Sequence, residues 1–181
     1  MRKRRLFGVL TFATSFVLLA AATFAVAGDG GKTQFKSDAL TGFQEVAGPG
    51  TISTIGTGTF DAVVDGDTIH YTLTYSDLEG GPVLFAHIHF GARGFSGGVS
   101  AFLCGGGGKP ACPPSPATVT GDITAADVIG PTAQGIEAGS FDEVVRALRA
   151  GAIYANVHTT RWPAGEVRGQ VNDSNQRVAP Q

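Results

Sequence analysis

The sequence predicts an all-β protein, an antiparallel β-sandwich or barrel of about eight short strands with one short helix in a crossover. Two observations support this class. Apolar and polar residues alternate with a period of two in several short segments, as in half-buried strands. Glycine is abundant, at 27 residues in the whole chain, and it occurs with many Thr and Val residues, a composition that suits tight turns and strands. The order of the strands in the sheet cannot be predicted from these patterns.

The first 27 residues have the features of a secretory signal peptide. A basic block at residues 2–5 precedes an uncharged apolar run over residues 6–27, which ends in the small-x-small motif A-V-A. We expect cleavage near Ala27; retention as a membrane anchor is the alternative, because the run is nearly long enough to span a bilayer. The expected location is secreted, periplasmic or extracellular, with membrane contact only through the signal peptide during export.

One domain is expected after the signal peptide. It comprises a short flexible lead-in at residues 28–34, a β domain at residues 35–172 and a polar C-terminal tail at residues 173–181. Removing the signal peptide takes away four of the 13 Lys and Arg residues and none of the 15 Asp and Glu residues, so the mature chain is acidic. It has no basic stripe, which argues against nucleic acid as a partner.

The individual strands follow from the alternation along the chain. Residues 57–64 and 69–75 flank an Asp-Gly-Asp turn signal, which predicts a hairpin. The other predicted strands are residues 33–40, 83–90, 98–103, 117–124, 151–158 and 165–172. A short helical turn is expected at residues 125–129.

Two cysteines, Cys104 and Cys112, flank a Gly-rich loop between two of these strands. An exported chain meets an oxidising compartment, so we expect a disulfide. The short loop can bring the two Cα atoms within bridging distance. Free thiols and metal ligation are the alternatives, although the spacing is not that of a zinc finger.

The single predicted helix covers about residues 140–150. Ser140 and Glu143 fit a capping box, in which each side chain bonds the backbone amide of the other residue. Gly151 then supplies a C-terminal stop. The apolar stripe between them is Phe141, Val144, Val145 and Leu148, at the spacing of one helix face.

Three motifs, in this order, resemble the CHRD domain family, which is found in chordin and in microbial exported proteins. They are G-T-G-T-F at residues 56–60, A-H-I-H-F-G at residues 86–91, and I-Y-A-N-V-H-T at residues 153–159 followed by G-E-V-R-G-Q at residues 165–170. The resemblance covers about residues 35–172. It implies an all-β fold and no assigned catalytic role.

The last two predicted strands carry a polar face. If they form an antiparallel hairpin, apolar residues must lie opposite one another, and the simplest register pairs Val157 with Val167. The neighbours on the polar face would then be His158 with Glu166 and Asn156 with Arg168.

Alternation also places His87 and His89 on one face of their strand. With His158 from another strand, they match the way β proteins hold copper or zinc, and Glu166 could orient His158. Cu/Zn superoxide dismutase also uses H-x-H on a β-sandwich strand, an analogy that suggests redox activity. The alternatives are a structural polar network and a surface that contacts a protein or glycan.

The sequence thus favours a non-enzymatic exported binding or surface/matrix module, whose ligand is an extracytoplasmic protein, a glycan or a metal ion. The alternative is a copper- or zinc-binding β-sandwich with superoxide dismutase-like activity. A G-x-S-x-G match at residues 94–98 lacks the strand–turn–helix context of a nucleophile, so no hydrolase is predicted and no catalytic residue is assigned.

Overall fold

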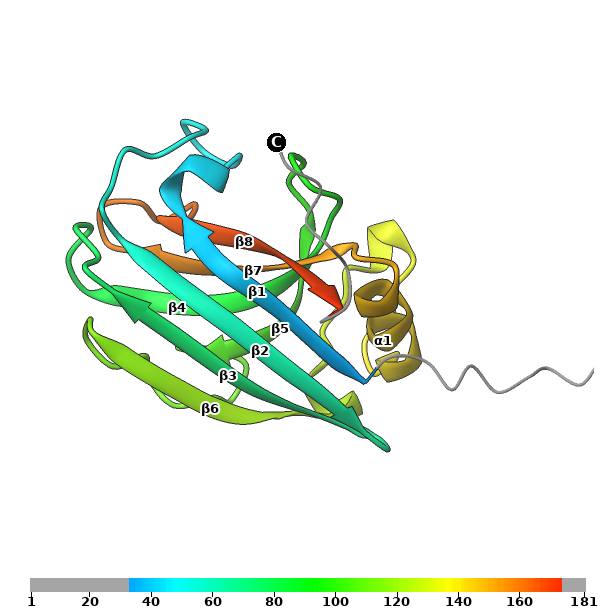
Figure 1. Cartoon of the computed structure of the whole chain (residues 1–181). Coiled ribbons are helices and arrows are strands. Elements are labelled where there is room, and N and C mark those ends of the chain that lie inside the picture. Colours follow the sequence, from blue (N-terminus) through cyan, green and yellow to red (C-terminus); the bar gives the residue numbers. More distant parts are fainter. Residues whose placement is uncertain (1–32, 174–181) are drawn as a thin grey trace, which may run out of the picture. The chain divides into compact units, whose positions relative to one another are not determined.

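The computed structural model describes residues 33–173, which form one all-antiparallel sheet of eight strands and a single α-helix (Figure 1). The predicted fold class is therefore confirmed. The predicted signal peptide, residues 28–32 of the lead-in and residues 174–181 of the tail lie outside the described residues. Within the described part of the chain, no helix has the length and apolar character needed to cross a membrane.

The strands lie within a few residues of the predicted positions. They are β1 (Gln34–Thr41), β2 (Thr57–Asp65), β3 (Thr68–Ser76), β4 (Val83–Phe90), β5 (Gly98–Cys104), β6 (Ala117–Ile123), β7 (Ile153–Thr159) and β8 (Val167–Asp173). Their order in the sheet is β5-β4-β7-β8-β1-β2-β3-β6. The predicted hairpin joins β2 to β3, where Asp65 pairs with Thr68 and Gly66 has a positive φ of 54°.

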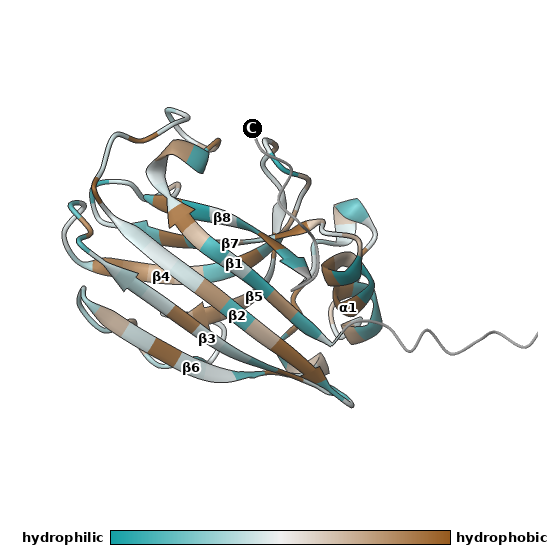
Figure 2. Ribbon diagram, in the orientation of Figure 1, coloured by the Kyte–Doolittle hydropathy of each residue, from teal (hydrophilic) through white to brown (hydrophobic). Residues whose placement is uncertain are grey.

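The sheet curls into a nearly closed barrel, so that β5 and β6 at its two edges contact each other. The Tyr71 hydroxyl of β3 donates to the Leu103 carbonyl of β5 across 2.7 Å, which links the two ends of the sheet. Figure 2 shows apolar and polar segments alternating along β1, β2 and β3, as expected when one face is buried. Large apolar side chains on the inner face include Phe35, Leu40, Phe60, Ile69, Leu73, Ile88, Leu103, Ile123 and Ile153.

The helix α1 (Phe141–Arg149) lies in the crossover from β6 to β7 and buries the predicted apolar stripe. The predicted capping box is wrong. Ser140 is the N-cap residue, but its side chain makes no capping hydrogen bond. The Glu143 carboxylate accepts a hydrogen bond from Arg146, three residues further along the helix, and so does not act as the second half of a box. A comparable contact occurs instead at the 3-10 turn η2 (Ala125–Asp127), where Asp127 Oδ2 accepts from the Thr124 amide at 2.8 Å.

The connection from β5 to β6 is closed by the predicted disulfide between Cys104 and Cys112, whose Cα atoms lie 5.0 Å apart. Inside this loop the Gly105 amide donates to the Pro110 carbonyl at 2.7 Å. Lys109 extends from the same loop and pairs with Asp127 at 2.6 Å. The disulfide and the ion pair together attach the loop to the edge of the sheet.

Candidate metal site

Two adjacent strands bring the three predicted histidines together. His87 and His89 lie on β4 and His158 lies on β7, and β4 pairs antiparallel with β7. Their side chains project from the face opposite the core, since the alternate residues Ala86 and Ile88 point inward and are fully buried. The histidines are nevertheless only 5%, 7% and 5% exposed, respectively. Hence this outer face is covered at the site.

The ring nitrogens of these histidines are close enough to share one ion. One ligand nitrogen from each residue lies within 4.8 Å of the other two. His87 Nδ1 and His158 Nε2 are 3.1 Å apart. Metal–nitrogen bonds of about 2.0–2.1 Å hold ligand nitrogens about 3.3–3.5 Å apart, so the nitrogens that are farthest apart would have to approach by up to about 1.5 Å to share one ion.

Backbone carbonyls determine which nitrogen carries the proton in two of the rings. His89 Nδ1 lies 3.0 Å from the Gly97 oxygen, and His158 Nδ1 lies 3.1 Å from the Pro163 oxygen. A carbonyl oxygen only accepts, so both Nδ1 atoms are donors and both Nε2 atoms carry a lone pair; that of His158 accepts from His87 Nδ1, and that of His89 has no hydrogen-bond partner. This is the usual arrangement for a metal-binding histidine, whose second nitrogen donates to a carbonyl or carboxylate.

Burial keeps all three imidazoles neutral near pH 7. It lowers the pKa of His87 to about 3, with a further contribution from His158 and His89. Burial likewise lowers the pKa of His89 to about 4 and that of His158 to about 4. Neutral imidazole is the form that binds metal ions.

Aromatic rings surround the three histidines. The Phe85 ring centre lies 4.8 Å from that of His87 and 4.8 Å from that of His158. Phe102 of β5 contacts His87 at 4.3 Å, and Tyr154 stacks on His89 at 4.6 Å with the rings almost parallel. The histidines therefore lie in a largely apolar environment that restricts their rotation.

The predicted register of the last hairpin is confirmed, with Val157 opposite Val167 and Asn156 opposite Arg168. Arg168 donates to the Phe95 carbonyl at 2.8 Å and holds the loop between β4 and β5 over the outer face of β8. Its guanidinium carbon also lies 3.4 Å from the centre of the Tyr154 ring.

The hydrogen bonds that Glu166 accepts come from residues other than His158. Its carboxylate accepts hydrogen bonds from the Thr54 hydroxyl at 2.9 Å and from the amides of Glu79 and Gly80 at 2.7 Å and 3.0 Å. It lies beside Thr159, because a Cβ placed on Gly80 would meet both the Thr159 hydroxyl and Glu166 Oε2. Thr159 and His158 are consecutive in β7 and face opposite ways, so the partner of His158 is the Pro163 carbonyl instead.

Sequence reasoning missed Glu45, a buried carboxyl group that is 3% exposed. Glu45 Oε1 accepts a hydrogen bond from Asn156 Nδ2, and burial raises the pKa of Glu45 to about 7, while Asn156 and Arg168 act in the opposite direction. Asn156 is 111 positions away in the chain, and no local pattern around Glu45 points to this contact. Only knowledge of which loop covers β7 could have identified it.

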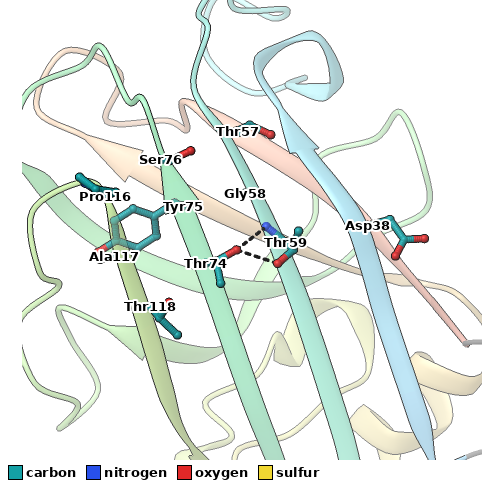
Figure 3. Close-up of a pocket in the computed structure, with 10 residues that line it drawn as sticks. All are labelled: Asp38, Thr57, Gly58, Thr59, Thr74, Tyr75, Ser76, Pro116, Ala117 and Thr118. Atoms are coloured by element: carbon teal, nitrogen blue, oxygen red, sulfur yellow. Dashed lines mark hydrogen bonds between the residues drawn. The ribbon is translucent and has the colours of Figure 1, made fainter.

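A hollow lies away from the histidines, on the outer face of the sheet, and Figure 3 shows it. It is an open groove of about 490 Å³ over β2, β3 and β6, lined mainly by hydroxyl-bearing and small side chains, with Asp38 from β1. The hydroxyls of Thr59 and Thr74 form a hydrogen bond of 2.7 Å with each other, so they are less available to hydrogen-bond a ligand in the groove. Its lining includes none of the predicted site residues.

Comparison with known proteins agrees with the motifs described above. The family model for the CHRD domain matches residues 37–171, which covers most of the chain and includes all three histidines. Searches of curated proteins and of solved structures found no match. The chain belongs to the CHRD domain family, and at the level of the family this supports a binding module of the non-enzymatic type.

Proposed function

We propose that this chain is an exported binding module whose ligand is a copper or zinc ion held by His87, His89 and His158. One observation carries the proposal: three buried imidazoles place ligand nitrogens within 4.8 Å of one another. Imidazole suits both metals, and among divalent ions copper binds such sites more tightly than zinc. Of the three ligand classes that the sequence suggests, we therefore propose a metal ion and not an extracytoplasmic protein or a glycan.

The hydrogen bonding favours a metal site over a purely structural network. Within residues 33–173, His89 Nε2 is a buried nitrogen with no hydrogen-bond partner. A buried polar atom without a partner destabilises a fold by about 1–3 kcal/mol; Ser100 Oγ, Thr159 Oγ1 and Gln170 Oε1 are also unpaired, but His89 Nε2 is the one that belongs to the histidine cluster. A bound ion would use this lone pair and would replace the hydrogen bond between His87 and His158.

Export is supported by the signal-peptide features of residues 1–27 and by the disulfide between Cys104 and Cys112, a bond that persists in oxidising compartments. In such a compartment the chain would take up its ion after secretion, once the histidines have come together. The proposal covers binding; superoxide dismutase-like turnover of a copper-loaded protein is a separate question for an activity assay.

The test is the metal content of the processed protein, expressed from the full chain, purified from a periplasm without an affinity tag and analysed by mass spectrometry. Wild type is compared with the triple variant His87→Ala, His89→Ala, His158→Ala. His70→Ala is the matched control, because His70 is exposed on β3 and pairs with Asp122 at 2.6 Å. We expect near-stoichiometric copper or zinc in wild type and control but not in the triple variant; equal content in all three would contradict the proposal.

A further inference from the structure

We infer that this site binds monovalent copper in preference to divalent ions and holds it with three nitrogen ligands alone. The inference rests on the proposed metal site and specifies its ligand. It follows from the donor atoms, from the apolar surroundings of the rings and from a buried arginine near His89.

The donor set carries no negative charge. Among the described residues, the cluster that could hold a metal contains three histidines and no Asp, Glu or Cys. Neutral ligands leave the full charge of the bound ion uncompensated. Beside three histidines, zinc also needs a water molecule as its fourth ligand to complete its tetrahedral coordination. Monovalent copper forms stable complexes with three nitrogens alone.

The surroundings disfavour a doubly charged ion. The rings of Phe85, Phe102 and Tyr154 lie 4.3–4.8 Å from the histidine rings that they contact. Transferring an ion from water into such a low-dielectric environment is unfavourable in proportion to the square of its charge. A divalent ion therefore loses about four times as much solvation free energy as a monovalent ion of similar size.

A fixed positive charge adds to this effect. Tyr154 lies on β7, between β4 and β8, so His89 and Arg168 approach its ring from opposite sides. Arg168 is 2% exposed and carries a permanent charge, which repels a divalent ion twice as strongly as a monovalent one. Glu45 interacts electrostatically with Arg168 and offsets part of this repulsion, but Glu45 is outside the metal-binding cluster.

The experiment compares two ions on the purified, metal-free processed protein under anaerobic conditions. Monovalent copper is titrated in competition with bicinchoninate, and zinc in competition with a chromophoric zinc chelator. We expect the dissociation constant for monovalent copper to be at least about tenfold lower than that for zinc, a difference of one decade in affinity. X-ray absorption at the copper edge should show three nitrogen neighbours.

Arg168→Gln tests the electrostatic part, with Arg161→Gln as the matched control. Arg161 is exposed and also lies over an aromatic ring, 4.7 Å from the centre of Trp162. Removing the charge of Arg168 should shift the ratio of the two affinities toward zinc by about tenfold, while Arg161→Gln should leave it unchanged. If Arg168→Gln does not fold, as judged by circular dichroism, the comparison of ions on the wild-type protein decides.

The outcomes separate this inference from the proposed function. Zinc bound as tightly as monovalent copper, or a four-coordinate copper site, overturns the inference and leaves the metal site in place. An unchanged ratio in a folded Arg168→Gln variant overturns the electrostatic argument. If neither ion binds wild type more tightly than the triple histidine variant, the proposed metal site itself is wrong.

Discussion

At the scale of single residues, burial shifts the pKa values of the three histidines and of Glu45, which lie at the outer face of β4, β7 and β8. The two kinds of group make stability change with pH in opposite directions. The histidines are neutral in the fold because burial lowers their pKa, whereas burial raises the pKa of Glu45. In each case the uncharged form is the one that the fold stabilises. Stability should therefore depend on pH with two contributions of opposite sign.

The histidines should make the metal-free protein sensitive to acid. Their pKa values are about 3 to 4 in the fold against 6.5 in an unfolded chain, so the unfolded state binds more protons in this range. The stabilisation is complete above about pH 6.5 and is lost as pH falls toward 4, by about 1.4 kcal/mol per unit of pKa shift. Urea unfolding from pH 4 to 8 measures this, and the triple histidine variant should show a much shallower slope. Equal slopes would show that folding does not lower the pKa of these histidines.

Glu45 should contribute with the opposite sign. Its pKa rises from 4.5 to about 7 on folding, so the folded state binds more protons between these values and its contribution to stability decreases as pH rises through them. Glu45→Gln removes this contribution. The free energy of unfolding of the variant, relative to wild type, should increase by up to about 3 kcal/mol between pH 4.5 and 8. A difference that does not vary with pH would place the pKa of Glu45 near its ordinary value.

At the scale of elements, Glu166 joins three parts of the chain that are far apart in sequence. It lies just before β8 and accepts hydrogen bonds from Thr54 and from two amides in the connection between β3 and β4. The side chain is completely buried, so these contacts are shielded from water. Its contribution should be to the stability of the fold and not to the metal site.

Glu166→Gln tests this assignment. The variant keeps the shape of the side chain but places an amide NH₂ where a carboxylate oxygen now accepts, which should destabilise the fold by about 1–3 kcal/mol. The affinity for copper should not change, because His158 is held by the Pro163 carbonyl. An affinity that falls together with stability would restore the role that the sequence suggested, in which Glu166 orients His158.

Local patterns predicted the strands well, because each strand has one face in the core and therefore alternates. The same alternation predicted the register of Val157 with Val167, which brings Asn156 opposite Arg168. It could not predict where the Glu166 side chain points, because Glu166 precedes β8 and the alternation of side chains between the two faces applies only within a strand. It also could not show that the loop between β4 and β5 covers the polar face, since Arg168 holds that loop by bonds to backbone carbonyls that no side-chain pattern reveals.

At the scale of the whole molecule, the nearly closed sheet buries one face in its core and uses the opposite face of β4 and β7 for the histidines. The sheet order could not be predicted from the sequence, because it depends on which strands meet across long connections. The H-x-H motif and the N-V-H-T motif become neighbours only because β7 pairs with β4. The fold thus assembles the candidate site from two segments about 70 residues apart, as between His87 and His158.

Export of the whole chain gives a prediction that is independent of the metal. The protein recovered from a periplasm should begin at Gly28 and should carry no free thiol, because the signal peptide is removed and Cys104 is bonded to Cys112. Intact mass before and after reduction and alkylation measures both properties. A mass that includes residues 1–27 would show that the segment is retained as an anchor.

The most direct test of the account is nitrogen-15 NMR of the histidine side chains as one equivalent of a diamagnetic ion, monovalent copper or zinc, is added. If the three histidines hold one ion, the Nε2 signals of His89 and His158 and a ring nitrogen of His87 should shift together and saturate at one ion per chain. The signals of His70, which lies on β3, should not move. Saturation without a change in the three buried histidines, or a shift of His70 alone, would contradict the account.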